Sequence, residues 1–239
     1  MAEPRSKTLT DDPNVAWRDV VRFIRQLSHD LRNHLNAIEL QSAYISELER
    51  EDDVKGEIKR LREIISGLTS TLQSLSKAVS EVKPSLIPYR ASDFVEDLRK
   101  KVAHDFSSES AKITWNIHAG DAMLNVDPQL LEESLTELLA NAFRDSHREG
   151  HVVVTAKVEN DRFLVTIEEP KKQFDLSADN WGREPLRNVS HGHYGLGLNR
   201  VRAIVEAHGG EMYAQYNPNA SLLTTTVALP VSGNSAKNE

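Results

Sequence analysis

The hydrophobic residues in the first third of the chain follow a helical period. From Asn14 to Leu48 there is neither proline nor glycine, and Asp12-Pro13 supplies a helix cap followed by proline at the first helical position. Apolar residues recur mostly at steps of three and four, at Val20, Phe23, Ile24, Leu27, Leu31, Leu35, Ile38, Ile45 and Leu48. This spacing predicts an amphipathic helix.

A second stretch repeats the period and is expected to be helical up to about Val82. Its apolar positions are Val54, Ile58, Leu61, Ile65, Leu68, Leu72, Leu75, Val79 and Val82. Steps alternating between four and three are typical of a coiled coil or helix bundle. The short charged turn at 49–53 makes the two helices antiparallel. One hairpin cannot cover both apolar stripes, so we expect two chains to pair into a four-helix bundle; a helical domain within one chain is the alternative.

Pro84 and Pro88 end the second helix and predict a linker. Helices are then expected at 92–106, 127–147 and 196–208, and strands at 112–118, 151–158, 163–168, 211–215 and 222–229. This order predicts an α/β sandwich with one mixed sheet, and with the hairpin an α+β fold class. The long polar segment 170–194, which precedes a glycine-rich turn, indicates a lid.

The expected organisation is a helical hairpin over 13–83, an α/β domain over 84–230 and a disordered tail over 231–239. The formal net charge of −7 argues against non-specific binding to nucleic acid. The absence of cysteine excludes disulfides and thiol catalysis. No run approaches the roughly 18 apolar residues that span a bilayer, and the polar N-terminus lacks the apolar core of a signal peptide. We therefore expect a cytoplasmic protein without a membrane segment.

His29 is a candidate nucleophile on the first helix. It stands two residues beyond Leu27 and points about 200° away from the apolar stripe. Its outer face also carries Arg22, Gln26, Asn33 and Asn36. A neutral imidazole is a competent nucleophile near pH 7, and the carboxylate of Asp30 could orient the ring or take up its proton. A surface histidine without a function is the alternative interpretation of this position alone.

The segment L-S-H-D-L-R-N-H-L-N resembles the H-box of sensor histidine kinases, where His is followed by Glu or Asp, then Arg, then Thr or Asn, and usually Pro. The resemblance implies that His29 accepts a phosphoryl group and that Asp30 assists. It also implies that Asn33 stands at the position linked to phosphatase action on the partner regulator. His34 replaces the usual proline and is a competing acceptor.

Two further motifs contain residues suited to binding Mg²⁺ and phosphate. In E-L-L-A-N-A, Glu137 and Asn141 stand four residues apart on one helical face, and Arg144 follows one turn later, within reach of a phosphate. An Asn oxygen suits Mg²⁺, and a Glu can hold a water or polarise an attacking group. Downstream, G-H-Y-G-L-G-L at 192–198 runs into a helix, whose N-terminus favours phosphate.

In this order the motifs resemble the N-box and G2-box of the GHKL superfamily, which includes sensor kinases, gyrase and Hsp90. The segment 200–212, ending H-G-G-E-M, is similar to the family's continuation, and 184–186 resembles a remnant of its F-box. The resemblance implies ATP and Mg²⁺ as cofactors and assigns Asn141 to the metal and Glu137 to its support. The phosphates would lie at the turn formed by Gly192, Gly195, Leu196 and Gly197.

The chain departs from the family at the G1-box. There the family has D-x-G-x-G, whose Asp binds the adenine amine, whereas this chain has E-E-P-K-K-Q-F at 168–174, without glycine. Glu168 or Glu169 could replace the Asp.

Three functions stay open at this point. A histidine kinase would transfer the γ-phosphate of ATP to His29 and then to an aspartate of a response-regulator receiver domain. A histidine phosphotransferase would keep the kinase shape without binding ATP, and the altered G1-box favours it. A docking protein would need neither His29 nor Asn141. A serine kinase of the same superfamily would leave the hairpin unexplained.

Overall fold

The computed structural model describes residues 17–48, 52–145, 151–172, 174 and 196–232. The chain divides into two compact units between Val79 and Ser80. The first unit is helical and the second combines helices with a sheet, which confirms the predicted α+β fold class. The predicted helix start at Pro13, most of the predicted turn at 49–53, most of the lid and most of the predicted tail at 231–239 lie outside the described residues. Contrary to the prediction, Asp52 and Asp53 belong to a helix, and Val231 and Ser232 belong to the last strand.

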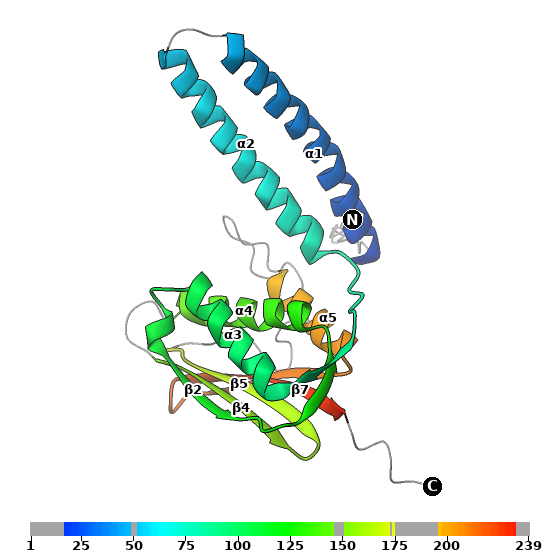
Figure 1. Cartoon of the computed structure of the whole chain (residues 1–239), viewed down its shortest axis with the longest axis vertical. Helices are drawn as coiled ribbons and strands as arrows, with labels where there is room; N and C mark the ends of the chain where they lie inside the picture. Colours follow the sequence, from blue (N-terminus) through cyan, green and yellow to red (C-terminus); the bar gives the residue numbers. More distant parts are fainter. Residues whose placement is uncertain (1–16, 49–51, 146–150, 173, 175–195, 233–239) are drawn as a thin grey trace, which may run out of the picture. The chain divides into compact units, whose positions relative to one another are not determined.

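The first unit is a hairpin of α1 (Trp17–Leu48) and α2 (Asp52–Ala78), which run antiparallel (Figure 1). The second helix ends at Ala78 and not at Val82 as predicted. The Arg25 guanidinium donates to the Val79 carbonyl at 2.8 Å, which satisfies one of the oxygens that a helix end leaves open. The second helix therefore ends about one turn earlier than the predicted Val82.

Within one hairpin, the two helices bury only a narrow stripe of side chains. Its members recur at multiples of seven residues, namely Ser28, Leu35 and Ser42 on α1, Ile58 and Ile65 on α2, and Val79 directly after α2. A second set of apolar side chains stays exposed, namely Phe23, Leu27, Leu31, Ile38 and Ile45 on α1 and Leu61, Ile64 and Leu68 on α2. The isolated hairpin thus covers one apolar stripe and leaves the other in water.

The second unit is built on one mixed sheet, as predicted, and this sheet has seven strands. Its strands are β1 (Ile87–Arg90), β2 (Ile113–His118), β3 (Met123–Val126), β4 (Val152–Glu159), β5 (Arg162–Pro170), β6 (Glu211–Asn217) and β7 (Leu222–Ser232). The path runs β1-β3-β7-β5-β4-β2, with β6 also paired to β7. Only the β2–β4 pair is parallel among the strand pairs described.

Three helices cover one face of this sheet, namely α3 (Ala91–Asp105), α4 (Pro128–Asp145) and α5 (Gly197–Ala207) (Figure 1). The core between them is fully buried, and the rings of Phe94 and Phe163 meet edge to face at 6.3 Å. α4 begins as predicted, because Asp127 accepts the Leu130 N–H at 3.1 Å and so caps the helix. None of the helices in the described ranges has the length and hydrophobicity needed to cross a bilayer.

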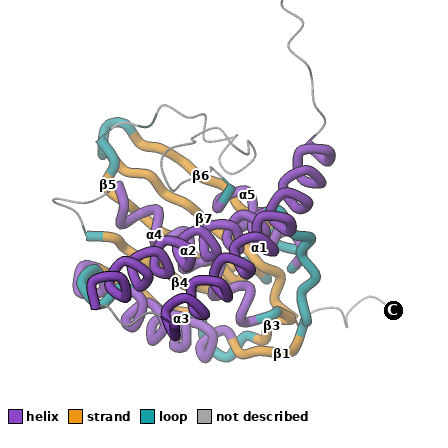
Figure 2. Tube along the Cα trace, turned by 90° about the horizontal axis from the view of Figure 1, so that it is seen from above, coloured by secondary structure: helices purple, strands orange, loops and turns teal. Residues whose placement is uncertain are grey.

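Two short strands were missed by the sequence prediction, which assigned the residues after Pro84 to a linker. β1 pairs antiparallel with β3, with Pro88 opposite Asn125, and the two lie side by side at one end of the sheet (Figure 2). Proline is tolerated there because β1 is an edge strand and one side of its backbone needs no ladder hydrogen bond. The N-terminal boundary of the sheet therefore starts at Ile87.

Candidate functional site

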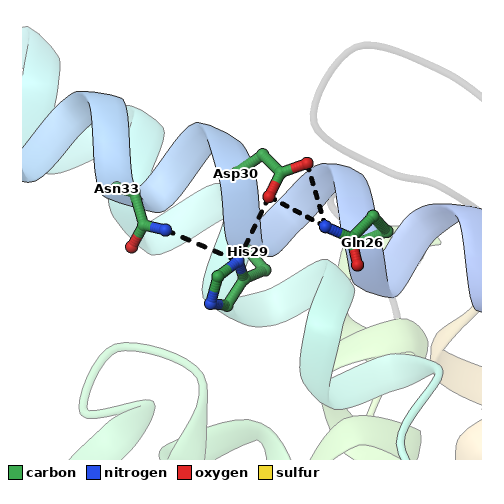
Figure 3. Close-up of polar contacts among 4 residues, drawn as sticks. All are labelled: Gln26, His29, Asp30 and Asn33. Carbon is green, nitrogen blue, oxygen red and sulfur yellow. Dashed lines mark hydrogen bonds and ion pairs between the residues drawn. The ribbon is translucent and has the colours of Figure 1, made fainter.

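His29 lies on the exposed surface of α1, with 65% of its side chain accessible. Its Nδ1 atom faces two neighbours: Asp30 Oδ1 at 3.2 Å and the Asn33 amide nitrogen at 3.5 Å (Figure 3). The structure thus brings together three of the predicted residues at one ring nitrogen. Their roles remain predictions.

The Asp30 contact favours one tautomer of the ring. An ionised carboxylate only accepts hydrogen bonds, so Nδ1 must carry the proton in that contact, and Nε2 keeps its lone pair. The pKa of Asp30 is lowered, first by a hydrogen bond from Gln26 and then by the bond with His29, which keeps the carboxylate charged at neutral pH. In this tautomer the free lone pair of the His29 ring is on Nε2.

His34, the competing acceptor, is also exposed. It stands five residues after His29, which turns it about 140° around the helix at 3.6 residues per turn. Asp30 lies four residues before His34 and next to His29, but its carboxylate is hydrogen-bonded to His29 Nδ1, and this contact favours His29 over His34.

The first residue of α5 packs directly on α4. A Cβ atom added to Gly197 would lie 3.0 Å from Glu137 Cδ and would also collide with the carboxylate oxygen. Only glycine allows this approach without a shift. The N-terminal end of α5 and the Glu137 carboxylate are thus adjacent, which joins the two predicted motifs in space.

Asn141 and Arg144 continue the same face of α4. Asn141 is half-buried and Arg144 is exposed. Leu196 stands at the N-cap of α5 and is buried. Gly192, Gly195 and the F-box remnant at 184–186 lie outside the described residues.

The donor set at this end suits a magnesium–phosphate group. Among the described residues, no three His, Asp or Glu side chains gather into a metal site. Mg²⁺ is usually held by one or two protein oxygens together with phosphates and water. Glu137, Asn141 and the helix N-terminus at Gly197 match that pattern, so the residues present fit the phosphate end of a nucleotide.

The sequence reasoning missed one residue that fixes this end. Arg200 in α5 lies 3.6 Å through Nε from Glu133 Oε1 of α4, and its Nη1 donates to Ser80 Oγ at 3.1 Å. From the sequence alone Arg200 is indistinguishable from an ordinary surface arginine, so its contacts with Glu133 and Ser80 could not be predicted. The contacts tie α5 to α4 and to the chain entering the second unit.

The part of the predicted nucleotide site that would hold the adenine base lies at the end of β5. Along β5 the buried face carries Phe163, Val165, Ile167 and Glu169 by strict alternation. Period-two counting therefore selects Glu169 and not Glu168 as the inward carboxylate, which the sequence analysis had left open. Glu169 is 7% exposed and its Oε1 lies 3.6 Å from the Lys171 ammonium, itself 15% exposed.

Lys171 is held at several of its atoms. Its backbone N–H donates to the Ser221 carbonyl at 2.7 Å, and its carbonyl accepts from the Tyr216 hydroxyl at 3.0 Å. Its ammonium lies 5.7 Å from the ring centre of Phe174, which packs against the Tyr216 ring at 5.5 Å. The ammonium lies near one carboxylate oxygen, Oε1, and a carboxylate has further lone pairs on both oxygens, so this ion pair does not prevent Glu169 from accepting the adenine amine.

Residues 126–232 match the family model described as "Histidine kinase-, DNA gyrase B-, and HSP90-like ATPase". The chain is 27% identical over 212 residues to the sensor histidine kinase ZraS of Klebsiella oxytoca, covering 87% of this chain and 45% of ZraS. It is 25% identical over 216 residues to the sensor histidine kinase CpxA of Escherichia coli K12, covering 84% of this chain and 45% of CpxA. The chain thus spans less than half the length of these curated relatives.

Two solved structures share the fold. Full-length ShkA, determined in complex with AMPPNP, matches with a TM-score of 0.67 at 18% identity, covering 90% of this chain and 47% of ShkA. The histidine kinase AdeS of Acinetobacter baumannii matches with a TM-score of 0.51 at 20% identity, covering 86% of this chain and 98% of that one. Both alignments extend over the hairpin and the sheet domain together, since they cover more of this chain than the second unit contains.

Proposed function

We propose that the chain is a two-component histidine kinase, because residues 126–232 match the model of the histidine kinase-, DNA gyrase B- and HSP90-like ATPases and the relatives named above are sensor histidine kinases. It would phosphorylate itself on His29 and pass the phosphoryl group to an aspartate of a response-regulator receiver domain. The observation that carries the proposal is the exposed His29 ring, held at Nδ1 by Asp30 on a hairpin that precedes the ATPase-type domain.

The proposed reaction uses the lone pair of His29 Nε2. Nε2 attacks the terminal phosphorus of ATP, the bond from that phosphorus to the bridging oxygen breaks, and ADP leaves. The proton on Nδ1 can then pass to Asp30 or to solvent, which leaves a phosphohistidine whose ring is neutral and whose phosphoryl group is negatively charged. Asn33 is proposed to orient a water during the reverse hydrolysis on the regulator.

The phosphates are proposed to lie between α4 and the start of α5. Asn141 would hold Mg²⁺, Glu137 would support it, and Arg144 and the backbone around Gly197 would face the phosphate oxygens. The metal would neutralise phosphate charge during transfer.

The hairpin is proposed to form a homodimer. The exposed apolar side chains on both helices would be covered by the same stripe of a second chain, which gives a four-helix bundle with twofold symmetry. The cytoplasmic location expected from the sequence also stays a prediction.

Incubation with Mg²⁺ and γ-labelled ATP tests the proposal. The wild type and His34→Ala should gain acid-labile label, whereas His29→Ala and Asn141→Ala should not. A label that survives in His29→Ala and is lost in His34→Ala would move the acceptor to His34. No label on the wild type at millimolar ATP would reject the kinase.

A second candidate is a histidine phosphotransferase, and the feature in its favour is the glycine-free segment at 168–174 in place of the G1-box. This protein would take its phosphoryl group from a phosphorylated receiver domain. It predicts that labelled receiver transfers its label to the wild type and to Asn141→Ala equally, and not to His29→Ala. Transfer that depends on ATP and Asn141 would reject it.

A further inference from the structure

Gln26 contacts the carboxylate beside His29. Its amide nitrogen lies 2.9 Å from Asp30 Oδ1 and 3.0 Å from Asp30 Oδ2, so one NH₂ group spans both oxygens (Figure 3). The two residues are four apart on α1, the spacing at which side chains on a helix meet. Gln26 is therefore the second neighbour of Asp30, on the side away from the His29 ring.

The Asp30–His29 contact needs such a neighbour. Residues adjacent in sequence point about 100° apart on a helix and do not ordinarily face each other. Asp30 reaches His29 Nδ1 only in a rotamer that turns its carboxylate back along the helix surface, and in water an exposed carboxylate has other rotamers open to it. The Gln26 amide selects that rotamer, because its NH₂ group binds both oxygens when Oδ1 faces the ring.

Asn33 makes the choice of rotamer consequential. Its amide nitrogen is 3.5 Å from the same Nδ1 atom. A donated bond from Asn33 would require an unprotonated Nδ1, and so the tautomer with the proton on Nε2. Asp30 and an Asn33 N–H donor therefore favour opposite tautomers of His29, and the shorter contact to a charged acceptor favours Asp30.

We propose that Gln26 is a positioning residue that fixes the tautomer of His29 by holding Asp30 against Nδ1. The proposal deepens the proposed function, because it concerns the nucleophile of that same reaction, and it rests on His29 being the acceptor. Gln26 itself touches neither the ring nor a substrate in this arrangement. The hydrogen bond from Gln26 is also the largest cause of the lowered pKa of Asp30, which agrees with a close contact to the charged carboxylate.

The test reads the tautomer directly. The full chain is labelled with ¹⁵N at histidine. Two-bond correlations of the ring are recorded at a pH high enough for the ring to be neutral. His29→Ala assigns the signal. The wild type should show mainly the Nδ1–H form, and Gln26→Met, which keeps length and loses the donor, should shift His29 toward the Nε2–H form.

Two matched variants separate positioning from general effects. Gln41→Met makes the same substitution at another exposed position of α1 and should leave the His29 signal unchanged. Gln26→Lys restores a donor at the same place and should return the signal toward that of the wild type. An identical His29 signal in the wild type and Gln26→Met would overturn the proposal, and so would an equal shift in Gln41→Met.

A chemical donor gives a second readout that needs no nucleotide. Phosphoramidate phosphorylates accessible imidazoles: the ring nitrogen attacks phosphorus, the phosphorus–nitrogen bond breaks and ammonia leaves. His29 should react several-fold more slowly in Gln26→Met than in the wild type or Gln41→Met. Equal rates in all three would count against the proposal.

The two proposals can fail separately. If Gln26→Met changes the tautomer but neither ATP nor a phosphorylated receiver ever labels His29, the proposed function fails and the positioning role stands. If His29 is labelled but Gln26→Met leaves the tautomer and the phosphoramidate rate unchanged, the positioning role fails alone.

Discussion

The hairpin and the sheet domain bury their apolar side chains to very different extents. In the hairpin, Leu27, Leu31 and Leu68 remain 39–51% exposed, whereas Leu131 and Leu135 on α4 of the sheet domain are completely buried. Apolar area left in water forfeits roughly 25 cal/mol for each square ångström. The sheet domain is thus complete within one chain, and the hairpin needs a further surface to cover it.

The same difference separates the two halves of the candidate site. His29 and its neighbours lie on an exposed helix, where side-chain hydrogen bonds compete with water, and Glu137 and Gly197 meet in a packed contact between helices. The nucleophile can therefore approach partners from solvent, while the predicted phosphate end depends on packing. Matched substitutions in the two units test this contrast.

The largest effect is expected from Leu135→Asp. An unpaired carboxylate in a fully buried position of α4 costs about 3–5 kcal/mol or more, a large part of the stability of an ordinary domain. The sheet domain should lose its cooperative unfolding transition, while the helical signal of the hairpin persists. Circular dichroism during urea titration measures both. A variant that unfolds with the wild-type midpoint would contradict the assigned core.

The same change in the hairpin, Leu68→Asp, should act on assembly and not on the fold of the sheet domain. Its charge would enter the proposed dimer interface, so the dimer should dissociate at concentrations at least tenfold higher than in the wild type. Light scattering after size exclusion measures this. Gln73→Asp, at an exposed position of α2, controls for the low helix propensity of Asp. A wild type that is monomeric at high concentration would refute the bundle.

Glycine-to-alanine substitutions should have opposite signs in the two units. At Gly197 the new methyl group meets the end of the Glu137 side chain, which must leave its rotamer, and this should destabilise the domain by about 0.5–1.5 kcal/mol. At Gly67, where no atom lies within 4 Å, alanine should stabilise α2 by up to about 1 kcal/mol. Urea unfolding of both variants gives the comparison. Adding Glu137→Ala to Gly197→Ala should recover part of the loss, and equal effects with and without Glu137 would refute the contact.

Local periodicity was sufficient to predict much of this architecture. The steps of three and four anticipated α1 and most of α2, and Asp127-Pro128 marked the start of α4. β1 and β3 were missed because four-residue strands contain too few positions to show alternation, and Pro88 suggested a linker. Their pairing depends on tertiary contacts that bring residues 87–90 beside 123–126.

The candidate site shows the same limit. Motif spacing placed His29, Asp30 and Asn33 on one helix. The resemblance assigned Glu137 and Gly197 to the same nucleotide site. The Lys171 contact with Glu169 could not be read from spacing alone, because it depends on how the chain leaves β5 and pairs with Ser221. Gln26 was visible as a member of the outer face, but its contact with both Asp30 oxygens depends on side-chain rotamers.

The smallest expected effect concerns a half-buried polar contact of the sheet domain, a counterpart to the exposed Gln26–Asp30 pair. The Tyr89 hydroxyl donates to Asp97 Oδ2 at 2.7 Å, and this bond, with some burial, raises the pKa of Tyr89 to about 12. A raised pKa means that the folded state holds the proton more tightly. The contribution to stability is therefore complete below about pH 10 and is lost as the pH rises toward 12.

Tyr89→Phe should thus be less stable than the wild type at pH 8, by no more than about 1 kcal/mol for one partly exposed hydrogen bond. The difference should shrink between pH 10 and pH 12, because the wild type loses the bond there and the variant has none to lose. Urea unfolding at pH 8, 10, 11 and 12 measures it, and ultraviolet titration should show one tyrosine that ionises late in the wild type and is missing in the variant. A stability difference that stays constant up to pH 12 would mean that the ring packing of Tyr89, and not its hydroxyl, stabilises this edge of the domain.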